Sequence, residues 1–498
     1  MAAMTRRELL RRSGQVAAAG AFASQLEWLT GCGSSGKAPR EPDWRDLAHQ
    51  IRGRVIRPGE AGYAQLRMPS NLRYADVLPA GIVLCKGPED IRQSILWARA
   101  HNLPAVPRAG GHSYSGYSVT HGLLVDLTRM NAVDVSRSDG IATIEPGALN
   151  TDIYDGLQPY GLAFSAGRCP TVAVSGLALG GGFGFSSRHL GLSADALQKT
   201  EIATADRQIL VCTEQENPDL FWACRGGGGG TFGINTSFTF RTWPVDNVTL
   251  YDLTWDWSEA AKVIAALQRV VTEAPNEWSM RIGIGSSGPP GKTRPTIEAL
   301  GQFFGPKREL VSILDPVLSA AKPRRQLIAR RTFWQAKTYL YDTTPVGRYA
   351  VKSNYVARAF SAEGIDILLR AVERWPGSSN KGGGGIALFA WGGAIGRVAP
   401  AETAFVHRTA RFLMAYDTAW GPHDPPSVVA ANLRWLDRLA ADIRPHVTEQ
   451  AYQNFIDRSL QDWRRAYYGS NFSRLVRVKK QFDPDNFFHF KQSVPTHL

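Results

Sequence analysis

The stretch DLFWACRGGGGGTFGI, residues 219–234, constrains the fold of this chain more than any other segment because it holds five consecutive glycines. Such loops expose backbone N–H groups and suit an anionic ligand such as a pyrophosphate. Gly228, Gly230 and Gly233 satisfy the pattern GxGxxG, which in a dinucleotide-binding Rossmann turn lies between a strand and a helix. Here the β-branched and aromatic run INTSFTFRTW follows, which predicts a strand. This context excludes a Rossmann turn.

Two further glycine-rich stretches stand earlier in the chain. They are RAGGHSYSGYS, residues 108–118, and GRCPTVAVSGLALGGGFG, residues 167–184. The imidazole in the first could serve as a metal ligand, a base or a nucleophile. The ten histidines show no metal-ligand spacing, and the patterns HExxH and GxSxG are absent from the sequence. These observations weigh against a hydrolase and a metalloenzyme, and we expect no bound metal.

The size and charge of the chain set wider limits. Its 498 residues suffice for two or more domains, and with 44% hydrophobic residues it can bury a sizeable core. The formal charge of +13 is spread along the chain without a long basic block, so we interpret it as surface solvation and expect no nucleic acid partner. Five cysteines without a CxxC pair are too few for a disulfide scaffold.

The N-terminus predicts export. In residues 1–31, TRRELLR places paired arginines before an Ala-rich apolar stretch, a layout similar to a twin-arginine signal. LTGC, ending at Cys32, resembles a lipoprotein cleavage box, and residues 32–43 read as a linker. We expect the twin-arginine export machinery of a bacterium to deliver a secreted protein, or a periplasmic or cell-surface lipoprotein attached to the membrane through Cys32. The alternative is an N-terminal tail with arginines placed by chance.

The composition and hydrophobic pattern of the rest of the chain change twice. Residues 44–245 alternate short apolar runs with glycine-rich turns, and PEDIRQSILWARAHN predicts a helix between two strands. Residues 246–445 combine long amphipathic patterns with strand-like runs, which predicts a second sheet with helices on one face. Residues 446–498 become aromatic and polar again. The sequence therefore predicts an α+β fold.

An ordered set of motifs resembles one family. The three glycine-rich stretches are followed by TAFVHR, AYQNF and YYGSNFSRLVRVKKQFDPDNFF. Together they are similar to the berberine bridge enzyme-like FAD-linked oxidases, within the vanillyl-alcohol-oxidase type of fold. The resemblance implies a two-domain PCMH-type FAD-binding fold. Residues 44–245 would bind FAD, residues 246–445 would form a substrate domain of antiparallel sheet covered by helices, and residues 446–498 would return to the FAD domain.

The resemblance also assigns residues. It implies covalent FAD, bonded through His112 to the flavin 8α carbon and through Cys169 to flavin C6, as in the bicovalent members of the family. Without it, His112 is an ordinary loop histidine and Cys169 a buried thiol. The other expected cofactor-binding residues lie in the same loops and in the C-terminal segment: Arg108, Ala109, Gly110, Gly111, Ser113, Ser118, Thr171, Val172, Gly176, Gly180, Gly181, Gly182, Gly230, Phe232, Gly233, Ile234 and Asn486.

The catalytic base and the substrate cleft follow from the same comparison. Tyr452 in AYQNF matches the first tyrosine of the family's YxNY segment, which often serves as the base, whereas Phe455 departs from the second. A tyrosine of pKa near 10 needs help to act as a base near neutral pH. We expect Tyr114, Trp391 and Tyr416 to contact the substrate; plain packing is the alternative for these three.

The resulting hypothesis is an oxidase that removes a hydride from an alcohol group of a carbohydrate, an oligosaccharide or a polycyclic natural product and passes the electrons to O2, giving H2O2. The family resemblance places Val172 beside the edge of the flavin that oxygen must reach, where valine accompanies oxygen use. Two alternatives stay open. One is a flavin dehydrogenase with another electron acceptor, and the other is a non-catalytic surface sugar-binding lipoprotein.

Overall fold

The computed structural model describes residues 41–343 and 346–498, so the predicted export signal, the cleavage box with Cys32 and most of the linker lie outside the described residues. All described residues belong to one compact unit. They form helices together with sheets that are mostly antiparallel, which confirms the α+β class. The domain boundaries given above stay predictions.

The N-terminal part holds a four-stranded sheet in the order β1-β2-β4-β3, in which β2, β4 and β3 run parallel. Its elements are α2 (Glu41–Gln50), β1 (Arg54–Ile56), α3 (Tyr63–Leu66), β2 (Gly81–Leu84), α4 (Pro88–Ala100), β3 (Ala105–Arg108) and β4 (Leu123–Asp126). Helix α4 begins with proline and two acidic residues, and it buries Ile91, Ile95 and Ala98 on one face. This is the helix that PEDIRQSILWARAHN predicts.

A five-stranded antiparallel sheet follows, in the order β5-β6-β10-β8-β9, beside a two-stranded pair of β7 and β11. The elements of this part are β5 (Val133–Ser136), β6 (Ile141–Ile144), α5 (Asn150–Leu157), β7 (Leu162–Ala163), α6 (Val174–Leu179), α7 (Ser187–Leu190), α8 (Ser193–Ala196), β8 (Leu197–Ala203), β9 (Ile209–Cys212), α9 (Pro218–Cys224), β10 (Ile234–Arg241) and β11 (Trp243–Pro244). Strand β10 directly follows the glycine run, as the sequence predicts.

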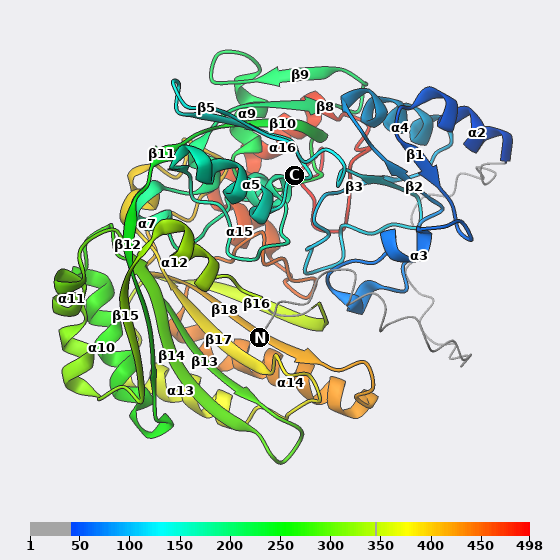
Figure 1. Ribbon diagram of the computed structural model, residues 1–498. Coiled ribbons are helices and arrows are strands. Elements are labelled where there is room, and N and C mark those ends of the chain that lie inside the picture. The colour runs from blue at the N-terminus through cyan, green and yellow to red at the C-terminus, as the bar shows by residue number, and fades with distance from the viewer. Residues whose placement is uncertain (1–40, 344–345) are drawn as a thin grey trace. The chain divides into compact units, whose positions relative to one another are not determined.

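A seven-stranded antiparallel sheet in the order β15-β12-β14-β13-β17-β18-β16 forms the second half. Figure 1 shows its helices α10, α11, α13 and α14 gathered on one side of the sheet. The elements are β12 (Asn247–Trp255), α10 (Ala260–Glu273), β13 (Arg281–Ser287), β14 (Arg294–Phe303), α11 (Lys307–Ala320), β15 (Arg325–Thr332), α12 (Phe333–Tyr339), β16 (Arg348–Val356), α13 (Ala362–Glu373), β17 (Gly384–Ala390), β18 (Phe412–Trp420) and α14 (Pro426–Ile443).

Alternate residues of each strand in this sheet face the helices. Ile282, Ile284, Phe412 and Met414 pack in one hydrophobic core with the helices, so the residues between them face the other way, toward the N-terminal half. That opposite face carries Phe389, Leu413 and Ala415, which pack with residues of the glycine-rich loops.

The C-terminal segment, with α15 (Trp463–Tyr468) and α16 (Phe472–Phe482), returns to the N-terminal half. Lys479 and Asp483 form a fully buried ion pair of 2.6 Å, and Lys479 also donates to the carbonyl of Thr231 beside the five-glycine run. Asp483 accepts the backbone N–H groups of Phe487 and Phe488. A buried ion pair needs this full set of hydrogen bonds to offset its desolvation, and the set fastens the segment to the glycine loop.

Candidate functional site

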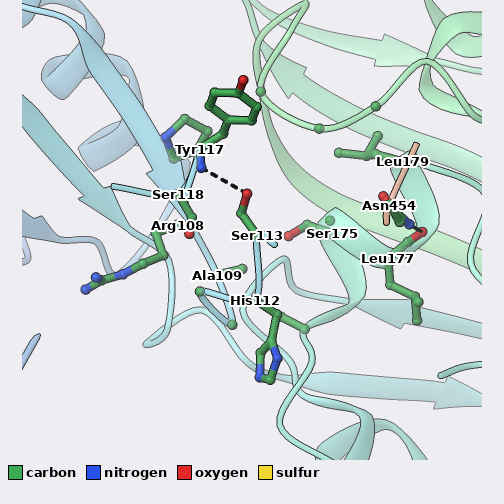
Figure 2. A pocket seen from close by; sticks show the side chains of 18 of the residues that line it. Arg108, Ala109, His112, Ser113, Tyr117, Ser118, Ser175, Leu177, Leu179 and Asn454 are labelled. Atoms are coloured by element: carbon green, nitrogen blue, oxygen red, sulfur yellow. Dashed lines mark hydrogen bonds between the residues drawn. The ribbon is translucent and has the colours of Figure 1, made fainter. Parts of the chain in front are cut away.

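A cavity of about 430 Å³ lies among the GGHSY loop, the glycine-rich stretches and the C-terminal segment. Figure 2 shows Ser113, Tyr117 and Ser118 on one side of it and Ser175, Leu177 and Asn454 on the other. Fifteen of the residues predicted from the sequence line this cavity: Arg108, Ala109, Gly110, Gly111, His112, Ser113, Tyr114, Ser118, Cys169, Val172, Gly176, Gly230, Gly233, Ile234 and Tyr452.

The two predicted attachment residues, His112 and Cys169, both reach this cavity. His112 Nε2 lies 2.9 Å from the hydroxyl of Thr171, and burial lowers the pKa of the imidazole to about 4. The ring is therefore neutral at physiological pH, and one nitrogen keeps a lone pair. The Cys169 backbone is held by hydrogen bonds to its carbonyl from Asn150 Nδ2 at 2.8 Å and from the Val172 N–H at 3.2 Å. Burial, with the nearby Asp342, raises the pKa of its thiol to about 12.

Several features of the cavity wall fit an FAD. Gly228 and Gly230 line it with φ angles of 90° and 69°, a left-handed backbone that glycine adopts without strain. The buried Ser118 Oγ and Gln453 Oε1 line it without a hydrogen-bond partner among the described residues. Buried polar atoms are normally paired, so these two favour a ligand with matching polar groups. The residues present therefore fit a nucleotide cofactor whose phosphates meet glycine N–H groups.

Tyr452 is fully enclosed beside the cavity. Its hydroxyl oxygen accepts hydrogen bonds from the Gly182 N–H and from Asn454 Nδ2, each 3.0 Å long. Burial raises the pKa of Tyr452, and these two hydrogen bonds act in the opposite direction. Donors aimed at a phenol oxygen stabilise its charged form, so the hydrogen bonds supply part of the help that a tyrosine base needs.

The sequence did not identify several residues of the cavity wall. They come from the turn after GGHSY, from α5 and α6, from the glycine run and from the C-terminal segment, and include Tyr117, Thr120, Asn150, Ser175, Leu177, Leu179, Gly228, Gly229, Gln453, Asn454, His489 and Phe490. Most stand within a few residues of a predicted position, so the motifs themselves held the signal. Asn150 is the exception, because it lies on a separate helix.

Some predicted cofactor residues do not line the cavity. Gly180 is close-packed instead: a Cβ there would lie 2.0 Å from Asn454 Oδ1. Gly181 and Gly182 similarly make room for Phe405 and Ser193. This glycine triplet therefore positions protein side chains. The other three do not reach the cavity wall either: Thr171 contacts His112, Phe232 is buried in the core, and Asn486 lies in the turn after Asp483.

Tyr416 and Trp391, two of the three expected substrate residues, do not line this cavity. Tyr416 lies on the helix-facing side of β18, where it is buried and donates to Asn354 Oδ1 at 2.8 Å. Trp391 is buried in an aromatic cluster with Phe183, and its indole donates to the carbonyl of His407. For Tyr416 the reason is that a strand presents only every second residue to each face. The neighbour Asp417 takes the site-facing position on β18. Trp391 lies just beyond the end of β17 and lines a second, smaller cavity with Phe389 and Arg168.

Tyr114, the third expected substrate residue, lines the cavity. Its ring stacks on Phe455 with centroids 5.3 Å apart and meets Tyr349 of β16 edge-on at 5.4 Å. The fully buried Asn71 donates to the carbonyls of both Tyr114 and Tyr349, at 3.0 and 3.1 Å. These contacts join the GGHSY loop to the edge of the seven-stranded sheet.

The sheet face toward the cavity carries charged side chains at its margins and small residues between them. Arg281 pairs with Phe389 across β13 and β17, so both share that face, and Arg281 forms an ion pair with Glu298 of β14. Asp417 lies two residues beyond Ala415 on the same face. Burial and the charge of Asp342 raise the pKa of Asp417 to about 7, while Arg281 opposes the shift. Between these charges the strands carry Gly283, Gly385 and Ala387.

Within residues 41–343 and 346–498 no three His, Cys, Asp or Glu side chains gather as a group able to hold a metal ion. No helix in the same ranges is both long and apolar enough to cross a bilayer.

Comparison with known proteins agrees with this geometry. Residues 79–213 match the FAD binding domain family, and residues 451–495 match the family described as berberine and berberine like. The uncharacterized FAD-linked oxidoreductase YgaK of Bacillus subtilis is 34% identical over 458 residues, which cover 90% of this chain and 97% of that protein. Xylooligosaccharide oxidase of Thermothelomyces thermophilus is 30% identical over 444 residues, covering 84% of this chain and 87% of the relative.

Solved structures show the same fold. The wild-type BBE-like 1 of Physcomitrella patens superposes with a TM-score of 0.82 at 28% identity, covering 91% of this chain and 99% of that chain. The site and the comparisons together define an FAD-linked oxidoreductase. The chain belongs to the berberine bridge enzyme-like family, as its motifs indicated.

The raised pKa of Asp417 predicts a pH-dependent stability. A carboxyl whose folded pKa is about 7, against an ordinary 3.8, favours the folded state most below about pH 4, and this contribution is lost as pH rises to about 7. Relative to Asp417→Asn, the wild type should lose up to about 1.4 kcal/mol per pH unit between pH 5 and pH 7.

Urea unfolding at each pH measures this difference. Asp366→Asn, which changes an exposed carboxylate on α13, is the control and should follow the wild-type curve. If the wild type and Asp417→Asn lose stability in parallel across this range, the carboxyl of Asp417 does not titrate as its surroundings indicate.

Proposed function

We propose that this chain is an oxidase that removes two electrons from an alcohol group and passes them to dioxygen, with FAD attached covalently through both His112 and Cys169. The observation that carries the proposal is that one cavity brings together these two residues, the glycine-rich loops and Tyr452. A surface protein that only binds sugars has no use for two attachment residues, so this alternative is disfavoured.

His112 and Cys169 would hold the cofactor from two separate loops. The neutral imidazole of His112 has a lone pair available for bonding, and the thiol of Cys169 is half-buried against the same cavity. Two attachment points fix a planar ring without enclosing it on every side. The cleft toward the seven-stranded sheet can then admit a bulky substrate.

The proton of the substrate alcohol would go to Tyr452. When bound, FAD supplies the two-electron oxidation, and the protein supplies orientation and proton transfer. The Tyr452 oxygen accepts hydrogen bonds from Gly182 and Asn454, so it is fixed in position, and its phenolate form keeps a third lone pair for the proton. The same two donors stabilise the phenolate that is the active base.

The polar margin of the sheet favours a carbohydrate over a polycyclic natural product. Arg281, Glu298 and Asp417 offer hydrogen-bond donors and acceptors on the face toward the flavin site, and hydroxyl groups of a sugar can satisfy them. Burying these polar groups against an apolar ring system would cost free energy. The small residues between them leave room for a sugar ring. The likeness to a xylooligosaccharide oxidase supports the same choice.

Val172 supports dioxygen as the electron acceptor. It lines the cavity, and its backbone is hydrogen-bonded to Cys169 and Asn150. A valine leaves a pocket that admits a diatomic molecule, and one added methylene can close it. The competing function is a dehydrogenase of the same fold with another acceptor, which differs only in this step.

Export by the twin-arginine route, with lipid attachment at Cys32, completes the proposal. It rests on TRRELLR and LTGC, which lie outside the described residues. That route carries folded proteins, so it suits an enzyme that takes up its cofactor in the cytoplasm.

Removing the attachment residues tests the double attachment. The wild-type protein should be yellow and keep its colour in the pellet after acid precipitation. His112→Ala and Cys169→Ala should each retain one covalent bond and a coloured pellet, whereas the double variant should release all its flavin. Colour in the supernatant of the wild type would contradict the proposal.

Replacing the base tests the role of Tyr452. Tyr452→Phe should slow flavin reduction about 10²- to 10⁴-fold, the usual loss when a general base is removed. The measurement is flavin bleaching without oxygen, with a substrate found in a panel of oligosaccharides and aromatic alcohols. Tyr416→Phe, on the opposite face of the sheet, is the control and should change the rate little. A Tyr452→Phe rate within a few-fold of wild type would place the base elsewhere.

A larger side chain at Val172 tests whether dioxygen is the electron acceptor. Val172→Leu should slow the return of flavin colour in air at least about tenfold while leaving bleaching by substrate nearly unchanged, because the added methylene fills the space that dioxygen needs. The bleaching rate serves as the internal control. A wild-type flavin that recovers its colour in air no faster than the variant, and turns over only with an artificial dye, would favour the dehydrogenase.

A further inference from the structure

The carboxylate of Asp342 lies beside both predicted attachment residues. Asp342 stands shortly after α12, and its backbone N–H donates to the carbonyl of Arg168 at 3.1 Å. The guanidinium of Arg168 donates back to Asp342 Oδ2 at 3.4 Å. Because Arg168 directly precedes Cys169, this pair of contacts fixes the carboxylate next to the thiol.

Electrostatics link Asp342 to the thiol as well. Burial raises the pKa of the Cys169 thiol most, the charge of Asp342 raises it further, and the charge of Arg168 opposes the shift. Asp342 acts on His112 through its charge alone, which raises the imidazole pKa slightly against the larger effect of burial. The Cys169 thiol is therefore protonated at neutral pH, and the carboxylate held by Arg168 is a nearby proton acceptor.

We propose that Asp342 accepts the thiol proton of Cys169 as the sulfur bonds to the flavin ring, and thereby promotes the second covalent attachment. This inference rests on the double attachment proposed above. It adds a proton acceptor that acts during maturation of the enzyme and is separate from Tyr452, the proposed base for substrate.

The bonding of Cys169 to the flavin ring is an oxidative coupling. The S–H bond of Cys169 and one ring C–H bond of the flavin break, and one S–C bond forms. Two protons and two electrons leave; the carboxylate of Asp342 takes the thiol proton and relays it to solvent, to which its side chain is 30% exposed. Dioxygen is the oxidant and leaves as hydrogen peroxide.

Other groups near the thiol fit this role less well. Arg168 is a permanent cation and cannot accept a proton. His112 is itself an attachment residue, and its Nε2 lies at hydrogen-bond distance from Thr171. The charge of Asp342 raises the pKa of Asp417, but Asp417 is not among the groups that shift the pKa of the Cys169 thiol.

Asp342→Asn keeps the shape of the side chain and removes the proton acceptor. The full chain is synthesised in a cell-free translation mixture containing FAD, translation is stopped, and samples are acidified over time. After digestion, mass spectrometry quantifies the peptide containing Cys169 that is joined through one flavin to the peptide containing His112. We expect the joined pair to form at least about 100-fold more slowly in Asp342→Asn. Flavin attachment at His112 alone should stay within a few-fold of wild type.

Two variants serve as controls. Asp342→Glu keeps a carboxylate and should restore most of the rate, and Asp366→Asn removes an exposed carboxylate on α13 and should leave the rate unchanged. An equal or faster rate in Asp342→Asn would overturn the inference while leaving the double attachment intact. Failure of Asp342→Asn to bind FAD would overturn it too, because Asp342 would then be a binding residue. Absence of the joined pair in the wild type would instead refute the double attachment itself.

Discussion

Three successive side chains of the C-terminal segment hold the two later glycine-rich loops together. Tyr452 accepts the N–H of Gly182, Gln453 donates to the carbonyl of Gly226 at 2.7 Å, and Asn454 donates to the carbonyl of Leu177 at 3.0 Å. Loops rich in glycine lose much conformational entropy on folding, so they need such external partners to keep one conformation. Without these hydrogen bonds the cavity would have no fixed wall.

The sequence predicted the parts of this arrangement that depend on local pattern. The glycine-rich stretches, the helix over residues 88–100 and the strand after the glycine run all follow from residue spacing and composition. Family motifs then located His112, Cys169 and Tyr452 at one cavity, although their chemical roles stay predictions.

Positions that depend on tertiary contacts could not be predicted from local sequence pattern. Tyr416 was assigned to the cleft although β18 turns it toward the helices, since a shift of one residue along a strand reverses the face. The glycines at 180–182 looked like cofactor contacts, but the space they leave is filled by Asn454 and Phe405. Asp342 belongs to no motif, and only the fold brings it to Arg168, next to Cys169.

Asn71 joins the loop of Tyr114 to the sheet strand of Tyr349 with two hydrogen bonds from one buried amide. These hydrogen bonds connect the two halves, and moving the halves apart would leave the buried amide of Asn71 without its two acceptors. With the two halves held in place, cofactor binding and substrate recognition can change independently in evolution. The cofactor region keeps its geometry, while replacements at Gly283 or Ala387 reshape the opposing sheet face one side chain at a time. New substrate preferences can then arise in this architecture without rebuilding the flavin site.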